Sequence, residues 1–215
     1  MILRRNIFWL ILAWPWTWTS VLAHPVSYQD GIGIMSYNSQ KMNELLLTYS
    51  FTPRFALAHT YLRDSGSEFY IPRANLLLRR WNEPDSQANI YTSFGSGSEK
   101  FGTKTSSTHL GEVVLDWESR KYYTYLEHLY LRRNNTANAA LPQQDYNHTK
   151  LRLGFAPFLA DYGDLNVWLI AQFDKHIDGK RIETTQFLRF YLKNVLWEVG
   201  SGFDGSIAFN FMIHI

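Results

Sequence analysis

The sequence lacks cysteine altogether: none occurs among its 215 residues. A disulfide framework and a thiolate metal site are therefore both excluded. After residue 23 the chain also lacks any long apolar run. A helix that crosses a bilayer needs about 20 consecutive apolar residues, so the sequence offers no such helix there.

An excess of charge of one sign is missing too. The chain has 21 Lys and Arg against 19 Asp and Glu, and two of the basic residues are Arg4 and Arg5 near its start. Without these two, basic and acidic residues balance. A surface that binds nucleic acid needs a clustered basic excess, so we expect no nucleic-acid partner.

Aromatic residues are abundant, at 16% of the chain, yet the mean hydropathy is only −0.25. Apolar residues are thus plentiful but dispersed, which is typical of strands with one apolar and one polar face. The sequence therefore favours an all-β protein.

The first 23 residues have the composition of an export signal. Arg4 and Arg5 precede the apolar residues 7–13, and a small residue, Ala23, closes the segment. Pro15 interrupts the apolar part, which is too short to span a bilayer comfortably. We predict a signal peptide over residues 1–23, export through the Sec pathway, and a single domain over residues 24–215. An uncleaved anchor is the alternative.

The last ten residues alternate strictly. Five apolar residues share one face, and small or polar residues share the other: Ile207, Phe209, Phe211, Ile213 and Ile215 against Ala208, Asn210, Met212 and His214. This is a strand pattern. It resembles the C-terminal strand of Gram-negative outer-membrane β-barrels, which the barrel-assembly machinery reads. The chain departs from that pattern in ending on Ile215 rather than Phe or Trp.

Similar alternation recurs along the chain in segments of roughly ten residues, the length that a tilted strand needs to cross a bilayer. About twelve strands result, with ten possible. Short connections near residues 53, 82–85, 119–120 and 193–194 alternate with long ones at 96–107, 133–144 and 175–182, and the connection at 157–164 is the exception. We therefore predict a closed antiparallel up-and-down transmembrane β-barrel. The alternative is a secreted periplasmic β-sandwich or a lipocalin-like binding protein.

If the apolar faces meet lipid, the opposite faces line the lumen. The predicted lumen-lining residues are Glu44, Arg73, Arg79, Glu112, Asp116, His148, Lys150, Arg152, Asp174, Arg189, Glu198 and Asn210. Both signs of charge are present, and buried charges must be paired. The lumen is thus either a closed, salt-bridged core or a narrow channel for small polar solutes.

A metal site is suggested by His24, Met212 and His214. Cleavage after Ala23 would make His24 the N-terminal residue, whose imidazole and α-amine together can chelate copper or another transition metal. The alternative is an ordinary terminus. No catalytic constellation is evident: the nearest pattern, Ser107-Thr108-His109, has no acid at a supporting spacing. We expect no enzymatic activity.

The opening His24-Pro25-Val26-Ser27-Tyr28, the stretch from Lys193 to Glu198 and the ending Asn210-Phe211-Met212 resemble a small uncharacterised family of Gram-negative barrel proteins. The resemblance covers the whole chain after the predicted leader. It implies an outer-membrane location, in contact with the lipid bilayer and lipopolysaccharide, and a loose association with transition-metal handling. It supplies no catalytic residues.

Overall fold

The computed structural model describes residues 24–134, 144–161, 163–176 and 181–215. The predicted leader, residues 1–23, lies outside the described part. Twelve strands follow one another: β1 Ile32–Ser39, β2 Met42–Thr52, β3 Phe55–Asp64, β4 Ser67–Glu83, β5 Ser86–Phe101, β6 Lys104–Ser119, β7 Tyr122–Arg133, β8 Tyr146–Phe155, β9 Asn166–His176, β10 Glu183–Leu192, β11 Val195–Gly202 and β12 Ile207–His214. Within the described residues, no helix is long and apolar enough to cross a membrane.

Each strand pairs with its neighbours in the sequence, and β1 pairs with β12 to close the barrel. All pairings are antiparallel, so the predicted closed up-and-down barrel is confirmed. The alternative of a β-sandwich is wrong, because a sandwich leaves sheet edges that this ring does not have. A lipocalin is wrong because its barrel has eight strands.

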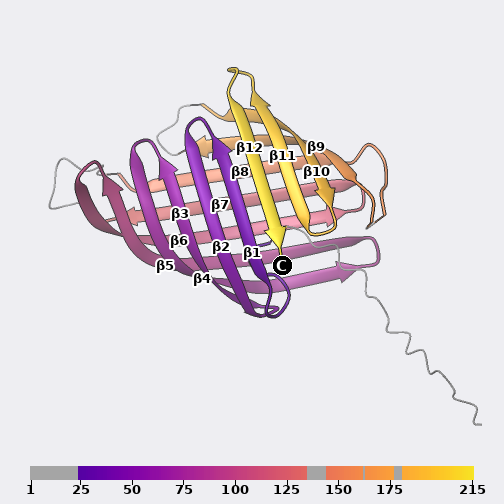
Figure 1. The fold of residues 1–215 in the computed structure, drawn as a ribbon, viewed down its shortest axis with the longest axis horizontal. Coiled ribbons are helices and arrows are strands. Elements are labelled where there is room, and N and C mark those ends of the chain that lie inside the picture. The colour runs from indigo at the N-terminus through magenta and orange to yellow at the C-terminus, as the bar shows by residue number, and fades with distance from the viewer. Residues whose placement is uncertain (1–23, 135–143, 162, 177–180) are drawn as a thin grey trace, which may run out of the picture.

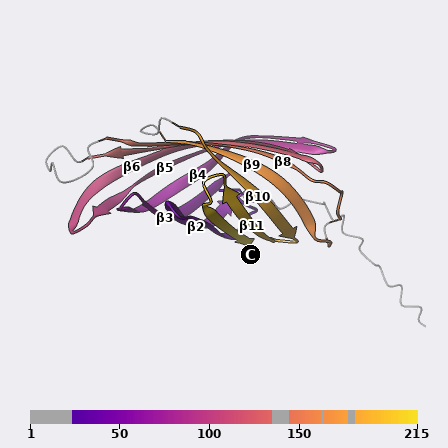
Figure 2. The same cartoon turned by 90° about the horizontal axis from the view of Figure 1, so that it is seen from above.

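The barrel is flattened, and its strands are strongly tilted. In Figure 1, strands β1–β3, β11 and β12 lie in front and cross the strands behind them at a steep angle. Figure 2 shows the flattening: β6, β8 and β9 lie along one side and β2, β3 and β11 along the other. Tilt is what closing a sheet into a barrel requires.

Alternation along each strand decides which side chains enter the lumen. In β12, Ala208 and Asn210 are 8% and 6% exposed, whereas Ile207 and Phe209 are 64% and 47% exposed. The polar residues thus lie inside and the apolar ones outside, which reverses the order of a water-soluble protein. An outer surface of this kind is stable against hydrocarbon, so the barrel is a transmembrane one.

The connections define two ends of the barrel. What we call the terminus end holds both ends of the described chain and the connections at 53–54, 84–85, 120–121 and 193–194. β8 also ends there and β9 begins there. The connections at 40–41, 65–66, 102–103 and 203–206 lie at the loop end, where β7 and β9 also end and β8 and β10 begin. Three of the loop-end connections are two-residue turns, so the predicted alternation of short and long connections holds only in part.

The predicted loop at 96–107 is wrong. β5 and β6 run through it as 16-residue strands and are joined by a turn at Gly102, whose φ is 59°. The outward-facing residues of this segment are polar, so its sequence lacks the alternation of apolar and polar residues that predicts a membrane strand. Gly97 is required there because a Cβ at this position would lie 2.0 Å from the backbone oxygen of Tyr70 on β4.

Polarity inverts along the long strands toward the loop end. Seven buried apolar side chains pack together inside this part of the barrel: Leu62, Phe69, Ile71, Leu110, Leu129, Leu131 and Tyr146. The outward residues of β5 and β6 next to the turn, such as Ser96, Lys100 and Ser107, are exposed and polar. An apolar interior with a polar exterior is the pattern of a sheet in water. The loop-end parts of β5 and β6 therefore extend beyond the hydrocarbon layer.

The prediction that Arg79 lines the lumen is also wrong. A β-bulge shifts the β4–β5 register between Leu77 and Arg79. One extra residue moves the following side chains to the opposite face. Arg79 is exposed, with its guanidinium 5.5 Å from the centroid of the Trp81 ring, whereas Arg80 turns inward.

Candidate functional site: the lumen

Two cavities lie in series inside the barrel. The larger, which we call the loop-end cavity, has a volume of about 100 Å³ and reaches from the loop-end turns down to Arg152 and Arg189. The smaller, the inner cavity, has about 20 Å³ and is lined by Pro25, Glu44 and Arg73, among others. Tyr37 and Tyr125 line both cavities, so these two rings form the constriction between them.

Glu198 is the centre of the most tightly bonded charge cluster. Its carboxylate accepts hydrogen bonds from Arg152 at 2.7 Å and from Arg189 at 2.6 Å. Asn210 donates a third at 2.6 Å. Arg189, Glu198 and Asn210 lie on the neighbouring strands β10, β11 and β12, and Arg152 lies on β8 across the lumen. The alternation of side chains along each strand places all four on the inner face. Each arginine also lies over an aromatic ring, Arg152 over Phe187 and Arg189 over Tyr123.

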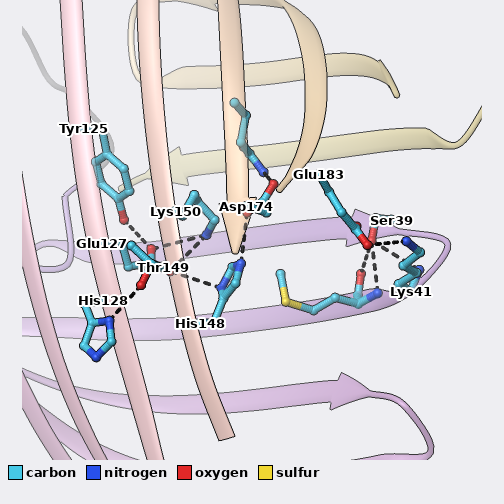
Figure 3. A network of polar contacts seen from close by, with 12 residues as sticks. Ser39, Lys41, Tyr125, Glu127, His128, His148, Thr149, Lys150, Asp174 and Glu183 are labelled. Atoms are coloured by element: carbon cyan, nitrogen blue, oxygen red, sulfur yellow. Dashed lines mark hydrogen bonds and ion pairs between the residues drawn. The ribbon is translucent and has the colours of Figure 1, made fainter. Parts of the chain in front are cut away.

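A second network lines one wall of the loop-end cavity (Figure 3). Lys150 donates to Glu127 at 3.0 Å, and the Tyr125 hydroxyl donates to the same carboxylate at 2.5 Å. His148 is 2.9 Å from Asp174 through Nε2 and stacks on the His176 ring at 4.5 Å between centroids. These contacts join β7, β8 and β9, so the charged wall is also a structural clamp.

Toward the terminus end, the wall is richer in carboxylates. Arg73 pairs with Glu112 at 3.0 Å, and Ser93 donates to the same carboxylate at 3.0 Å. Asp116 accepts a hydrogen bond from Asn89 at 2.7 Å. Glu44 lines the inner cavity beside this group. Its carboxylate has no salt-bridge partner among the described residues.

At the mouth of the loop-end cavity, Lys41 and Glu183 form an ion pair at 2.5 Å. Both side chains are about half exposed, at 57% and 45%. The hydrogen bond to Glu183 raises the pKa of Lys41, which lies in the β1–β2 turn. An exposed pair of this kind adds little to stability.

Every predicted lumen residue except Arg79 faces the inside of the barrel. These residues are Glu44, Arg73, Glu112, Asp116, His148, Lys150, Arg152, Asp174, Arg189, Glu198 and Asn210. Five further inward residues did not follow from the sequence pattern: Asp64, Arg80, Glu99, Glu127 and Arg133. Glu99 and Arg133, 3.0 Å apart, fell in predicted loops. Glu127 lies in a stretch with apolar residues on both faces, where alternation is uninformative.

The three predicted metal ligands have different immediate neighbours. His24 is buried against Asp116, with Nδ1 3.2 Å from the carboxylate. Met212 packs with Met35, Leu46 and Leu196. His214 is buried, and neither of its ring nitrogens has a hydrogen-bond partner. No group of three or more His, Cys, Asp and Glu that could hold a metal ion occurs in the described part of the chain.

Comparison with known proteins finds similar chains among solved structures. No family model and no curated protein matches the chain. Among solved structures it is similar to the KdgM porin, at 10% identity over 86% of this chain and 97% of that chain, with a TM-score of 0.47. The KdgM porin in complex with disordered oligogalacturonate is similar at 11% identity over the same shares, with a TM-score of 0.49.

The outer membrane protein opdK from Pseudomonas aeruginosa is similar at 9% identity over 84% of this chain and 60% of that chain, with a TM-score of 0.41. These neighbours are porins and outer-membrane proteins, and none of the three is described as an enzyme. At such identities the likeness concerns the fold alone. The resemblance to a small uncharacterised family stays a prediction.

Proposed function

We propose that this chain is a narrow outer-membrane channel for small polar solutes, with a preference for cations. The observation that carries the proposal is the series of two cavities in a lumen lined by ionic groups. Twelve strands enclose more volume than the eight that side chains can just fill, so room for a polar path is expected.

The preference for cations follows from the inward charges. Among the described residues, nine carboxylates face inward: Glu44, Asp64, Glu99, Glu112, Asp116, Glu118, Glu127, Asp174 and Glu198. Six cationic side chains face them: Arg73, Arg80, Arg133, Lys150, Arg152 and Arg189. When every one of these carboxylates is ionised and the histidines are neutral, the wall carries a formal charge of −3. A negative, water-poor pore attracts cations and repels anions.

A reversal-potential measurement tests this proposal. The protein, purified from membranes in detergent, is inserted into a planar bilayer under a gradient of KCl. We expect small discrete conductance steps and a reversal potential on the K⁺ side of zero. A chloride-side reversal potential would overturn the cation preference, and a bilayer without any steps would overturn a channel that is open in the parent protein.

The proposed location is the Gram-negative outer membrane, reached by Sec export and insertion through the C-terminal strand. Support comes from the apolar outer face of β12, where Ile207 and Phe209 are exposed on the barrel surface. Lipopolysaccharide is the expected lipid partner on the loop-end side. Membrane fractionation, with a variant whose last strand carries Phe209→Asp, tests this: the variant should fail to insert and be degraded.

Metal binding is a second proposal, favoured by the geometry of His24. With Nδ1 directed at Asp116, the Nε2 atom is the free ring nitrogen, and it has no hydrogen-bond partner. A carboxylate on the opposite nitrogen is the usual support of a metal-bound histidine. Copper titration by calorimetry, comparing the parent protein with His24→Ala, should show a site that the variant lacks. Equal binding by both would overturn it.

A further inference from the structure

Residues 24–27, which we call the plug, lie inside the terminus end of the barrel without belonging to any strand. Val26 is fully buried and His24 is 7% exposed. Val26 packs in a cluster with Ala56, Leu77 and Val114, which come from three different strands. The plug therefore occupies the lumen itself rather than the outside of the wall.

Side chains of the barrel wall make polar contacts with His24, Pro25 and Ser27 of the plug. Asp116 is 3.2 Å from His24, whose ring also stacks on Tyr91 at 5.5 Å between centroids. Asn75 donates to the backbone oxygen of Pro25 at 2.9 Å. The backbone N–H of Ser27 donates to the Ser50 hydroxyl at 2.9 Å. The three polar contacts come from side chains and not from a strand ladder, so water can replace each of them.

The plug also lies on the path through the lumen. Pro25 lines the inner cavity, on the side away from the loop-end cavity. A solute that passes the constriction at Tyr37 and Tyr125 therefore meets the plug before it reaches the terminus end.

A fixed turn joins the plug to the wall. The N–H of Asp30 donates to the backbone oxygen of Ser50 at 2.7 Å, and that of Gly31 donates to Tyr28 at 3.1 Å. Asp30 has a φ of 61°, a left-handed conformation that Asp tolerates. The chain before this turn is held by side chains, whereas the chain after it enters β1. The turn is thus a natural pivot.

We propose that the plug is a gate: it closes the channel at the terminus end and opens it by swinging out about the turn at residues 28–31. This proposal rests on the proposed channel function and names how that channel is regulated. The opening is a rearrangement of side-chain contacts and leaves the strand ladder of the barrel intact.

The absence of cysteine from the chain makes a direct test possible. A single Val26→Cys variant, in isolated outer membranes, is treated with a charged maleimide. We expect labelling at least tenfold slower than for Ser65→Cys, which lies in an exposed loop-end turn. Adding Asn75→Ala and Asp116→Asn to Val26→Cys removes two holding contacts and should speed its labelling tenfold or more. Labelling of Val26→Cys as fast as that of Ser65→Cys would overturn the proposal.

Conductance supplies the second measurement. Val26→Asp places a carboxylate among apolar side chains, which should expel the plug and raise the open fraction several-fold, whereas Val26→Ala should behave like the parent protein. Heat-modifiable migration on gels checks that both variants are folded barrels. A parent protein that conducts as well as Val26→Asp would overturn the gate alone. Silence of the parent and of both variants would overturn the channel, and the gate with it.

Discussion

Replacing Glu198 with glutamine should destabilise the barrel strongly. The Glu198 side chain is 1% exposed, and its carboxylate is the shared acceptor of Arg152 and Arg189. Glutamine keeps the volume of the side chain but removes its charge. One of its two terminal groups is then an amide NH₂, a donor facing groups that can only donate.

The expected loss of stability follows from the two arginines that remain buried without their carboxylate. Two guanidinium groups, each about 5% exposed, lose the only carboxylate within salt-bridge distance among the described residues. Removing one partner of a buried ion pair typically costs about 3–5 kcal/mol. A separate calculation from hydrogen bonds agrees, because each bond to a charged group contributes about 1.5–3 kcal/mol and two are weakened. We therefore expect a loss of about 3–5 kcal/mol in the free energy of unfolding.

The assay is urea unfolding of the folded barrel in detergent or lipid vesicles, followed by heat-modifiable gel migration and tryptophan fluorescence. Glu183→Gln is the matched control, because it breaks the half-exposed pair with Lys41 and should cost about 1 kcal/mol or less. If Glu198→Gln unfolds within about 1 kcal/mol of the parent protein, the arginines are solvated in a way that the buried cluster does not permit, and the reasoning fails.

Three further changes test other parts of the structure. Gly97→Ala should lower stability by about 1–3 kcal/mol through its clash with β4, whereas Gly111→Ala, with open space around its Cβ, should not; urea unfolding of the two variants side by side decides this. Glu44→Gln removes a carboxylate from the inner cavity and should shift the KCl reversal potential toward zero, and an unchanged potential would show that this residue does not contribute to selectivity. The Tyr130 hydroxyl, together with the Arg133 N–H, lowers the pKa of Asp145. This contact therefore stabilises the folded state fully above the ordinary carboxyl pKa of about 3.9, and the stabilisation is lost as pH falls through the lowered pKa. Tyr130→Phe should therefore destabilise at about pH 7 and have little effect at about pH 2, and an equal effect at both would contradict the assignment.

Much of the fold could be predicted from the sequence, because a strand of a membrane barrel can be recognised from the pattern of its own residues. Each residue faces lipid or lumen according to its parity, and the pattern of β12 is legible without knowing any partner strand. The same parity placed Arg152, Arg189 and Glu198 on inner faces. Parity could not show that these three side chains contact one another, because β8 lies far from β11 in the sequence.

Prediction failed where local pattern and tertiary environment disagree. The segment at 96–107 has polar outward residues because it extends into water, so it has the composition of a loop although it is paired strand. Arg79 was misplaced because the bulge at residues 77–79 is a property of pairing with β5, not of β4 alone.

The sequence by itself determined the class of this protein: strands with one apolar and one polar face, the absence of cysteine and a balanced charge indicate a transmembrane barrel. Only the tertiary structure decided how the lumen is filled. Closure of the ring brings distant inner faces together, so it alone pairs two arginines with one glutamate, narrows the path between Tyr37 and Tyr125, and seats residues 24–27 against five strands. Contacts across the barrel depend on the curvature of the whole sheet, which no single segment encodes.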